Sequence, residues 1–536
     1  MNALLLATLL VPLAGIVALY ALPRAVAERL ATRLGFYTGA AVLVLTIVLA
    51  CVFDYAKTGY QGRVDWNWIP ALHVRFQLGV DGISLPLVLL TALLSALCFF
   101  YSIRHVPDGG SQRSYTALLL MLEIGVLGTF LAGDLILFFI FFEIVLLPMW
   151  ALIANWGSEG AKAAATKFIL YTLLGSAVMV VGFLVVFAYA DSFDIAWLTA
   201  HARSDVPKGA ALTAFALIAL GFAVKTPMFP LHTWLPDAHT AAPTTGSVLL
   251  AGVLLKMGTY GFVRIAVPIL PQAAPTYAPA LAAFGVVGVI YGSLACLSIV
   301  RKPDGDLKRL IAYSSIGHMG FVLLGIGSLT PVGMNAALFA SVAHGLITGL
   351  LFFLVGGLKV RMHSAKLDDL GRALYRRAPK YGVLLAFAAM ASLGLPGLAG
   401  FWGEVLALFS ATRPGSGLRQ GSYIAMAAVA GLGLVLTATY LLAVVRRVCM
   451  GPAAVVGVGS GVGSGVGSGT DSDADGSSAE TAEAAEAAEA PEMTELTAVE
   501  TVTWSPLVLL TLATGLWPAM LLGITNPAVQ VLMKGV

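Results

Sequence analysis

Long runs of apolar residues dominate the chain, and short polar stretches separate them. An α-helix needs about 20 mostly apolar residues to cross roughly 30 Å of hydrocarbon. The runs are continuous rather than alternating, which is typical of helices and not of transmembrane β-strands. The pattern predicts an all-α polytopic membrane protein with about 14 transmembrane helices. The fourteen windows fall at approximately 3–22, 34–53, 83–103, 115–132, 134–154, 164–189, 211–229, 242–268, 275–299, 308–328, 333–358, 380–411, 422–445 and 503–530.

The composition indicates that lipid surrounds most of the chain. Of the 536 residues, 59% are hydrophobic and only 11% are charged, against about 25% charged in an ordinary soluble domain. The net charge of +3 is too small to indicate a nucleic-acid partner. No CxxC pattern is present, so neither an iron–sulfur cluster nor a metal site is predicted in this chain. The four cysteines lie far apart, at Cys51, Cys98, Cys296 and Cys449.

Basic residues are distributed unequally between the two sets of loops. The loops after the odd-numbered windows hold most of the 31 lysines and arginines, with a dense group at 359–380. Because cytoplasmic loops carry an excess of positive charge, this set is predicted to be cytoplasmic. An even number of helices then places the N- and C-termini outside.

Seven ionisable residues interrupt the apolar windows. Each costs about 2.5 to 3.5 kcal/mol at the centre of the bilayer on insertion scales, so each needs compensation. A single buried Glu and Lys would be explained as a structural ion pair, and a single histidine would be explained by an interhelical hydrogen bond. Groups spread over seven windows favour a proton relay instead. The seven are Glu123, Glu143, Lys225, Lys256, His318, His344 and Glu404.

Within this relay, Glu143 and Lys225 form a plausible switch. A carboxylate beside an ammonium stabilises its charge, so moving one partner changes how tightly the lysine holds its proton. Histidine titrates closest to neutral pH, which makes His318 and His344 the predicted intermediate carriers. Arg264 lies near the end of its window and is expected to extend to the lipid headgroups.

Two windows contain helix-breaking residues next to an ionisable group. The stretch 226–230 contains two prolines directly after Lys225, and the stretch 394–397 lies shortly before Glu404. Proline removes a backbone donor and glycine loosens the helix, so the seventh and twelfth helices are predicted to be discontinuous. The breaks lie five windows apart. An odd number of helices per unit predicts two inverted repeats, windows four to eight and nine to thirteen.

These features divide the chain into five segments. A Gly/Ser-rich acidic stretch at 451–502 interrupts the helical pattern, and we expect it to be a flexible insertion. Its GVGSGVGSG text superficially matches a dinucleotide motif, but no strand precedes it. The segments are 1–110 with three helices, 111–270 with the first repeat, 271–450 with the second repeat, the insertion 451–502, and 503–536 with the last helix.

Four stretches resemble the antiporter-like membrane subunits of respiratory complex I. The resemblance implies that Glu143 pairs with Lys225 and that Lys256 continues a central hydrophilic axis. It also places Glu404 at the far end, where L-type and N-type siblings typically carry lysine. The histidines at 318 and 344 match polar positions on the axis. The four stretches are LIALGFAVKTPMFPLHTWLPDAHTAAPTTGSVLLAGVLLKMGTYGFVR, FFIFFEIVLLPMW, DLKRLIAYSSIGHMGFV and LGLPGLAGFWGE.

The same resemblance implies a function and partners. It implies that this chain is a proton-translocating, non-redox subunit of NADH:quinone oxidoreductase in the bacterial inner membrane. FMN and iron–sulfur clusters are then expected in partner subunits, with no cofactor in this chain, and L-like and N-like subunits on both flanks. Two alternatives stay open. One is a subunit of a multi-subunit sodium/proton antiporter, which shares the fold, and the other is a scaffold that conducts no protons.

Overall fold

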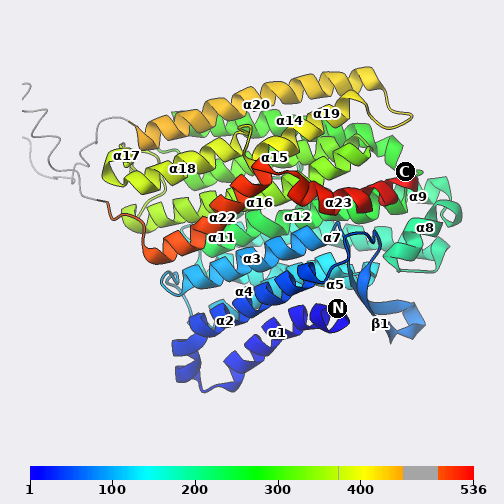
Figure 1. The fold of residues 1–536 in the computed structure, drawn as a ribbon, viewed down its shortest axis with the longest axis horizontal. Helices are drawn as coiled ribbons and strands as arrows, with labels where there is room; N and C mark the ends of the chain where they lie inside the picture. Colours follow the sequence, from blue (N-terminus) through cyan, green and yellow to red (C-terminus); the bar gives the residue numbers. More distant parts are fainter. Residues whose placement is uncertain (372, 451–492, 536) are drawn as a thin grey trace, which may run out of the picture.

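The computed structural model describes residues 1–371, 373–450 and 493–535. Within these residues, thirteen helices are long and apolar enough to cross a membrane. Figure 1 shows the helices running side by side, with α1 and α2 at one edge of the bundle and α20 at the opposite edge. The predicted helical membrane fold is confirmed, and the chain is a multi-pass membrane protein.

The first eight predicted windows correspond to helices in the first half of the chain. They are α1 (Asn2–Ala21), α2 (Arg24–Cys51), α3 (Leu85–Ser102), α4 (Gln112–Leu131), the consecutive α5 (Leu135–Ile144) and α6 (Leu146–Trp156), α7 (Ala161–Ala190), α9 (Lys208–Lys225), and the run of α11 (Thr244–Leu249), the π-helix η2 (Leu250–Leu254), α12 (Leu255–Gly261), the π-helix η3 (Phe262–Ala266) and α13 (Val267–Ile269). Two short helices lie between these, α8 (Ile195–Asp205) and α10 (Trp234–Ala241).

The second half continues in the same manner. Its helices are α14 (Ala274–Arg301), α15 (Leu307–Gly327), α16 (Pro331–Met362), the short α17 (Leu374–Arg377), α18 (Pro379–Ser392), α19 (Ala399–Thr412), α20 (Gln420–Cys449), α22 (Ala498–Leu516) and α23 (Ala519–Leu532). The window 380–411 is divided between α18 and α19, which explains why thirteen uninterrupted spans correspond to fourteen windows. Most of the expected insertion, 451–492, lies outside the described residues, and its last residues already belong to α22.

Both predicted helix breaks are present. Helix α9 ends at Lys225 and α10 begins at Trp234, so the proline-containing stretch between them leaves the helical path. The indole Nε1 of Trp234 donates to the Val224 carbonyl at 3.1 Å, which ties the two half-helices together. Helix α18 ends at Ser392 and α19 begins at Ala399. Each break therefore lies beside a candidate ionisable residue, as the sequence predicts.

The structure also contains a β-hairpin between α2 and α3, which the all-α prediction does not include. Strands β1 (Gln61–Ile69) and β2 (Val74–Val80) pair antiparallel, with Trp66 opposite Phe76. The short helix η1 (Pro70–Leu72) connects them, and Figure 1 shows the hairpin extending past the ends of the neighbouring helices. The unpaired edges of a two-stranded hairpin need water as their hydrogen-bond partner, so the hairpin lies outside the hydrocarbon. A search for apolar windows long enough to cross a bilayer therefore does not find it.

A buried ion pair fastens α22 to α16. The guanidinium of Arg361 binds the Glu500 carboxylate through two contacts, of 2.6 and 2.7 Å. The same guanidinium donates to the backbone carbonyls of Thr494 and Glu495. The Glu500 side chain is fully buried, and Thr497 also caps it at the start of the helix. This cluster fixes where the chain returns to the bundle after residue 492.

We expect Arg361→Met to destabilise the protein, because removing one partner of a buried pair costs about 3 to 5 kcal/mol. The measurement is the temperature at which the detergent-purified protein loses its native elution profile. Lys57→Met is the matched control, since Lys57 pairs with Asp54 at the surface. Equal thermal shifts in the two variants would show that the Arg361 cluster does not hold α22.

Candidate functional site

The seven candidate residues lie inside the helical bundle. Five have almost no exposed surface, although each carries an ionisable group. They are Glu123, Lys225, Lys256, His344 and Glu404. The remaining two, Glu143 and His318, are partly buried. Burial thus keeps five of the seven groups away from bulk solvent and lipid.

Lys256 and His344 form the central contact of the site. The Nζ atom of Lys256 lies 2.5 Å from Nδ1 of His344, and it donates at 2.5 Å to the carbonyl of Ala251. Ala251 belongs to the π-helical turn η2, which directly precedes α12 and its Lys256. Such π-turns widen a helix locally and frequently occur at functional sites. The lysine on α12 is thereby linked to the histidine on α16.

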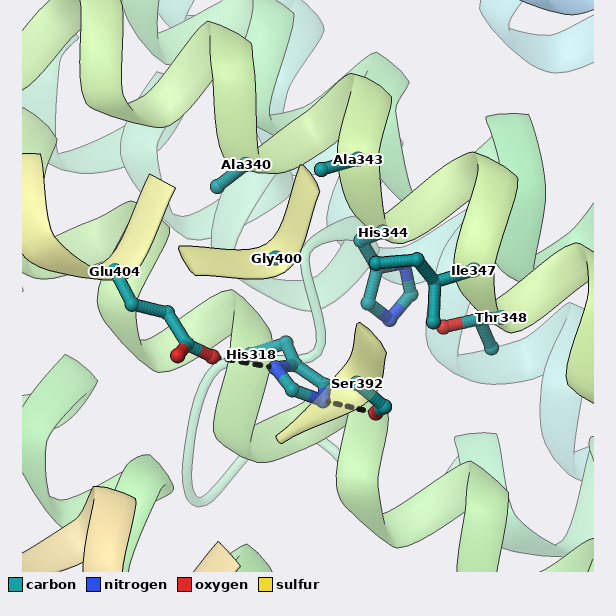
Figure 2. A pocket seen from close by; sticks show the side chains of 9 residues that line it. All are labelled: His318, Ala340, Ala343, His344, Ile347, Thr348, Ser392, Gly400 and Glu404. Carbon is teal, nitrogen blue, oxygen red and sulfur yellow. Dashed lines mark hydrogen bonds and ion pairs between the residues drawn. The ribbon is translucent and has the colours of Figure 1, made fainter. Parts of the chain in front are cut away.

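A second contact continues from His344 toward Glu404. The rings of His344 and His318 lie 5.6 Å apart between centroids. Figure 2 shows His318 between two partners, with Nδ1 at 3.1 Å from Glu404 Oε1 and Nε2 at 3.0 Å from Ser392 Oγ. Both ring nitrogens of His318 therefore lie within hydrogen-bonding distance of a polar side chain.

The two histidines line a small cavity with Glu404 and Ser392. Its volume is about 20 Å³, and a water molecule needs about 10 to 15 Å³. The Nε2 atom of His344 is buried and has no hydrogen-bond partner among the described residues. The cavity therefore provides room for a water molecule between the two imidazoles, and the four groups Lys256, His344, His318 and Glu404 form one line.

The predicted contact between Glu143 and Lys225 is not formed. Within the described residues, the ion pairs closer than 4.0 Å do not include it. Lys225 Nζ instead lies 4.8 Å from the centroid of the Phe142 ring, and it has no hydrogen-bond partner in the part of the chain that the structure describes. The face of an aromatic ring attracts a cation, which compensates part of the charge. The ammonium of Lys225 thus has an aromatic ring beside it and no carboxylate within ion-pair distance among the described residues.

The prediction that Arg264 extends to the headgroups is wrong. Its side chain is buried and forms an ion pair with Asp81, while the Tyr60 ring lies 5.0 Å from its guanidinium carbon. The loop after β2 supplies Asp81, and that loop lies outside every apolar window. Glu123, by contrast, has two buried carboxylate oxygens without a protein partner in the described chain.

Two further buried groups were missed by the sequence reasoning. Lys308 is the first residue of the window 308–328 and is not among the seven candidates, but only 4% of its surface is exposed and its amine donates to the Ala242 carbonyl. His239 is completely buried and stacks on Phe352 at 4.6 Å between ring centroids. His239 lies in the LPDAH text, so the family resemblance is the signal that points to it. No apolar window includes that text, and hydropathy therefore overlooks it.

Comparison with known proteins places this arrangement in a family. Residues 132–437 match the family described as NADH:quinone oxidoreductase/Mrp antiporter, transmembrane. This region is more than half of the chain and includes six of the seven candidate residues. The chain belongs to this family.

Individual members of the family are similar over most of their length. The NAD(P)H-quinone oxidoreductase chain 4 1 of Synechococcus sp. (strain JA-2-3B'a(2-13)) is 41% identical over 410 residues, 76% of this chain and 75% of the relative. The NADH-quinone oxidoreductase subunit M of Rickettsia typhi is 36% identical, over 76% of this chain and 79% of the relative. A chain in the structure of respiratory complex I from Thermus thermophilus matches with a TM-score of 0.80 and 28% identity, over 99% of both chains.

The backbone at Gly394 makes room for the Glu404 carboxylate. Gly394 has φ of +80°, and a Cβ atom there would clash with Glu404 Oε2. We expect Gly394→Ala to displace the carboxylate from His318 and to destabilise the protein. Gly417→Ala is the control, since its φ of +84° is similar but no atom of the described residues lies within 4 Å of the added Cβ.

The control isolates backbone strain, which costs about 1 to 2 kcal/mol for an alanine in the left-handed region. The measurement is the thermal denaturation temperature of both purified variants. A drop for Gly394→Ala no larger than that for Gly417→Ala would show that Glu404 is not held by this turn.

Proposed function

We propose that this chain is the M-type proton-translocating membrane subunit of a NADH:quinone oxidoreductase, the respiratory complex I. The observation that carries the proposal is the buried line from Lys256 through His344 and His318 to Glu404. Relatives named NADH-quinone oxidoreductase subunit M and chain 4 support this reaction rather than another. Glutamate at position 404 further supports the M type, because the resemblance gives lysine to the L and N types.

Protons move along this line by successive transfers between nitrogen and oxygen atoms. The Lys256 ammonium gives a proton to His344 Nδ1, and the His344 ring releases one from Nε2 to water in the cavity. His318 accepts it and passes it to Glu404, whose carboxylate holds it before release. Each step breaks one N–H or O–H bond and forms another, so no redox group is required.

The Glu143 and Lys225 pair provides the switch that drives the line. Two unit charges at 4 Å attract by about 4 kcal/mol at an effective dielectric constant of 20, and by about half that at 8 Å. The difference corresponds to more than tenfold in proton affinity. Approach of the carboxylate therefore makes Lys225 hold its proton, and separation makes Lys225 release it toward Lys256. The conformation with Phe142 beside the ammonium represents the separated state.

The redox steps of the proposed reaction take place in partner subunits. In this proposal the chain is the non-redox part of the enzyme, while FMN, iron–sulfur clusters and quinone bind elsewhere in the complex. L-like and N-like subunits flank it in the bacterial inner membrane, and both termini face outward. The segments 111–270 and 271–450 act as two inverted repeats, so that each opens to one side of the membrane. The helix breaks after Lys225 and before Glu404 support this symmetry.

A sodium/proton antiporter subunit is the main alternative, since the family includes Mrp antiporters. Reconstituted vesicles distinguish the two functions. We expect NADH-driven proton uptake that does not depend on sodium. Sodium-dependent proton flux without NADH would favour the antiporter.

We expect Lys256→Met to abolish most proton pumping in the assembled complex. Losing one proton-transfer group lowers the rate by about 10² to 10⁴-fold, and Lys256 is the donor to His344. The measurement is dye quenching by NADH-driven proton uptake in proteoliposomes. Lys162→Met, at an exposed position on α7, is the matched control and should pump normally. Normal pumping by Lys256→Met would contradict the relay and favour the scaffold.

A parallel expectation concerns the switch. Glu143→Gln keeps the size of the side chain but removes its charge, so Lys225 loses the partner that sets its proton affinity. We expect assembly with strongly reduced NADH:quinone turnover and pumping in both Glu143→Gln and Lys225→Met. If either variant keeps both activities, this pair is not the switch.

A further inference from the structure

A polar cavity of about 430 Å³ lies where α14 ends and α15 begins. The loop between these helices follows the ninth predicted window, so the positive-inside rule predicts that the cavity lies on the cytoplasmic side of the membrane. Ser298 and Tyr313 contribute hydroxyl groups to the lining. The charged residues of the lining are Lys302, Asp304, Asp306 and Arg309.

The charges in this lining balance, and part of them is available to a ligand. Arg309 donates from its guanidinium to Asp237 at 3.4 Å, and its backbone amide donates to the Asp306 carboxylate at 2.7 Å. A guanidinium has five N–H donors, so most of those of Arg309 stay available. The side chains of Lys302 and Asp304 are exposed and form no ion pair closer than 4.0 Å with another described residue.

An apolar stripe on α14 leads from this cavity along the bundle. The side chains of Phe284, Val287 and Leu294 are exposed by 41%, 43% and 51%, and Tyr291 between them is partly exposed. Residues three or four apart lie on one face of a helix, so these four form a continuous stripe that reaches Ser298 in the cavity lining. The rise from Val287 to Ser298 is about 16 Å, close to half of the roughly 30 Å of hydrocarbon in a bilayer.

A polar cavity above an apolar stripe of this length matches the shape of one phospholipid molecule. The headgroup region lies at the end of the helix, and one leaflet of acyl chain lies along its face. Tyr313 in the lining fits this depth, because tyrosine is enriched at the boundary between hydrocarbon and water.

The balance of charges selects the class of headgroup. A basic pocket between helices recruits an anionic lipid, but an anionic headgroup in this cavity meets the carboxylates of Asp304 and Asp306 as well as the two cations. A headgroup that carries both a phosphate and a primary ammonium satisfies both signs. The planar guanidinium of Arg309 matches a phosphate group, and an ammonium donates charge-assisted hydrogen bonds to a carboxylate.

We propose that this cavity binds the headgroup of a phosphatidylethanolamine-type phospholipid and that one acyl chain of this lipid lies along the α14 stripe. The phosphate accepts hydrogen bonds from Arg309 and Lys302, and the ammonium donates to Asp304. No covalent bond is formed or broken. The site goes beyond the proposed function and is independent of it.

The lipid lies beside the break between α9 and α10. Tyr291 of the stripe contacts two residues of this break, with 5.2 Å to Phe229 and 4.8 Å to His232 between ring centroids. An acyl chain on the stripe therefore packs against the aromatic side chains that cover the break. A ligand that binds one arrangement of a protein stabilises that arrangement, so the lipid stabilises the break that follows Lys225.

The test uses the complete complex in vesicles of phosphatidylcholine. Each preparation contains a small fraction of a phospholipid whose acyl chain carries a photoactivatable diazirine, with either an ethanolamine or a glycerol headgroup. After illumination, mass spectrometry measures how much lipid is attached to residues 284–298. The variants are Lys302→Met, Arg309→Met and Asp304→Asn. Arg301→Met is the matched control, because Arg301 is exposed at the same helix end but does not line the cavity.

We expect stronger labelling by the ethanolamine probe than by the glycerol probe in the unaltered complex. One exposed ion pair contributes about 0.2 to 1 kcal/mol, which is about 1.4-fold to fivefold in binding. Labelling by the ethanolamine probe should fall by this factor in Lys302→Met and in Arg309→Met, and it should stay unchanged in Arg301→Met. Asp304→Asn should remove the preference for ethanolamine over glycerol.

Three results would overturn the proposal. Equal labelling by both probes in the unaltered complex would show that the cavity does not select this headgroup. Labelling of Lys302→Met and Asp304→Asn that equals the labelling of Arg301→Met would show that the cavity does not bind the headgroup, and these two variants decide if Arg309→Met fails to assemble. No label on residues 284–298 would show that a partner chain covers the stripe. Labelling does not require proton pumping, so each result is independent of the proposed function.

Discussion

The hydrogen bond between Lys256 and His344 is the interaction around which the interior of this protein is organised. Lipid offers no compensation for an ammonium group, so a lysine at the middle of a bundle survives only beside groups that share its proton. The π-turn η2 places a backbone carbonyl at the amine, and α16 places the imidazole. Both groups reach the Lys256 amine because the helical segments that carry them meet at this residue.

The helix breaks also help to accommodate charged groups inside the bundle. A continuous helix satisfies its own backbone groups and presents only side chains, whereas a broken helix leaves space and polar backbone near the bilayer midplane. Lys225 is the last residue of α9, and the turn at Gly394 keeps room for the Glu404 carboxylate. The breaks therefore place ionisable groups where water can reach them without opening the bundle to lipid.

The two ends of the proposed relay differ in the partners of their ionisable groups. Toward Glu404, each titratable group has a polar neighbour within hydrogen-bonding distance, and His318 is bound on both sides. Toward Glu143, the ammonium of Lys225 faces an aromatic ring instead. The first arrangement suits stable conduction, and the second suits a group whose partner moves. One bundle thus combines a fixed path with a variable contact.

The sequence by itself determined the membrane helices and the two breaks, and it pointed to the residues of the proposed relay. Hydropathy and proline act over a few neighbouring residues, and a charge within an apolar run is visible without knowing the fold. Only the tertiary structure decided the partners. Asp81 reaches Arg264 from a loop outside every window, the Phe142 ring lies beside the Lys225 ammonium, and Lys308 lies buried against Ala242 although it follows a polar loop. Such contacts join residues far apart in the chain, so they depend on how helices pack and leave no local pattern.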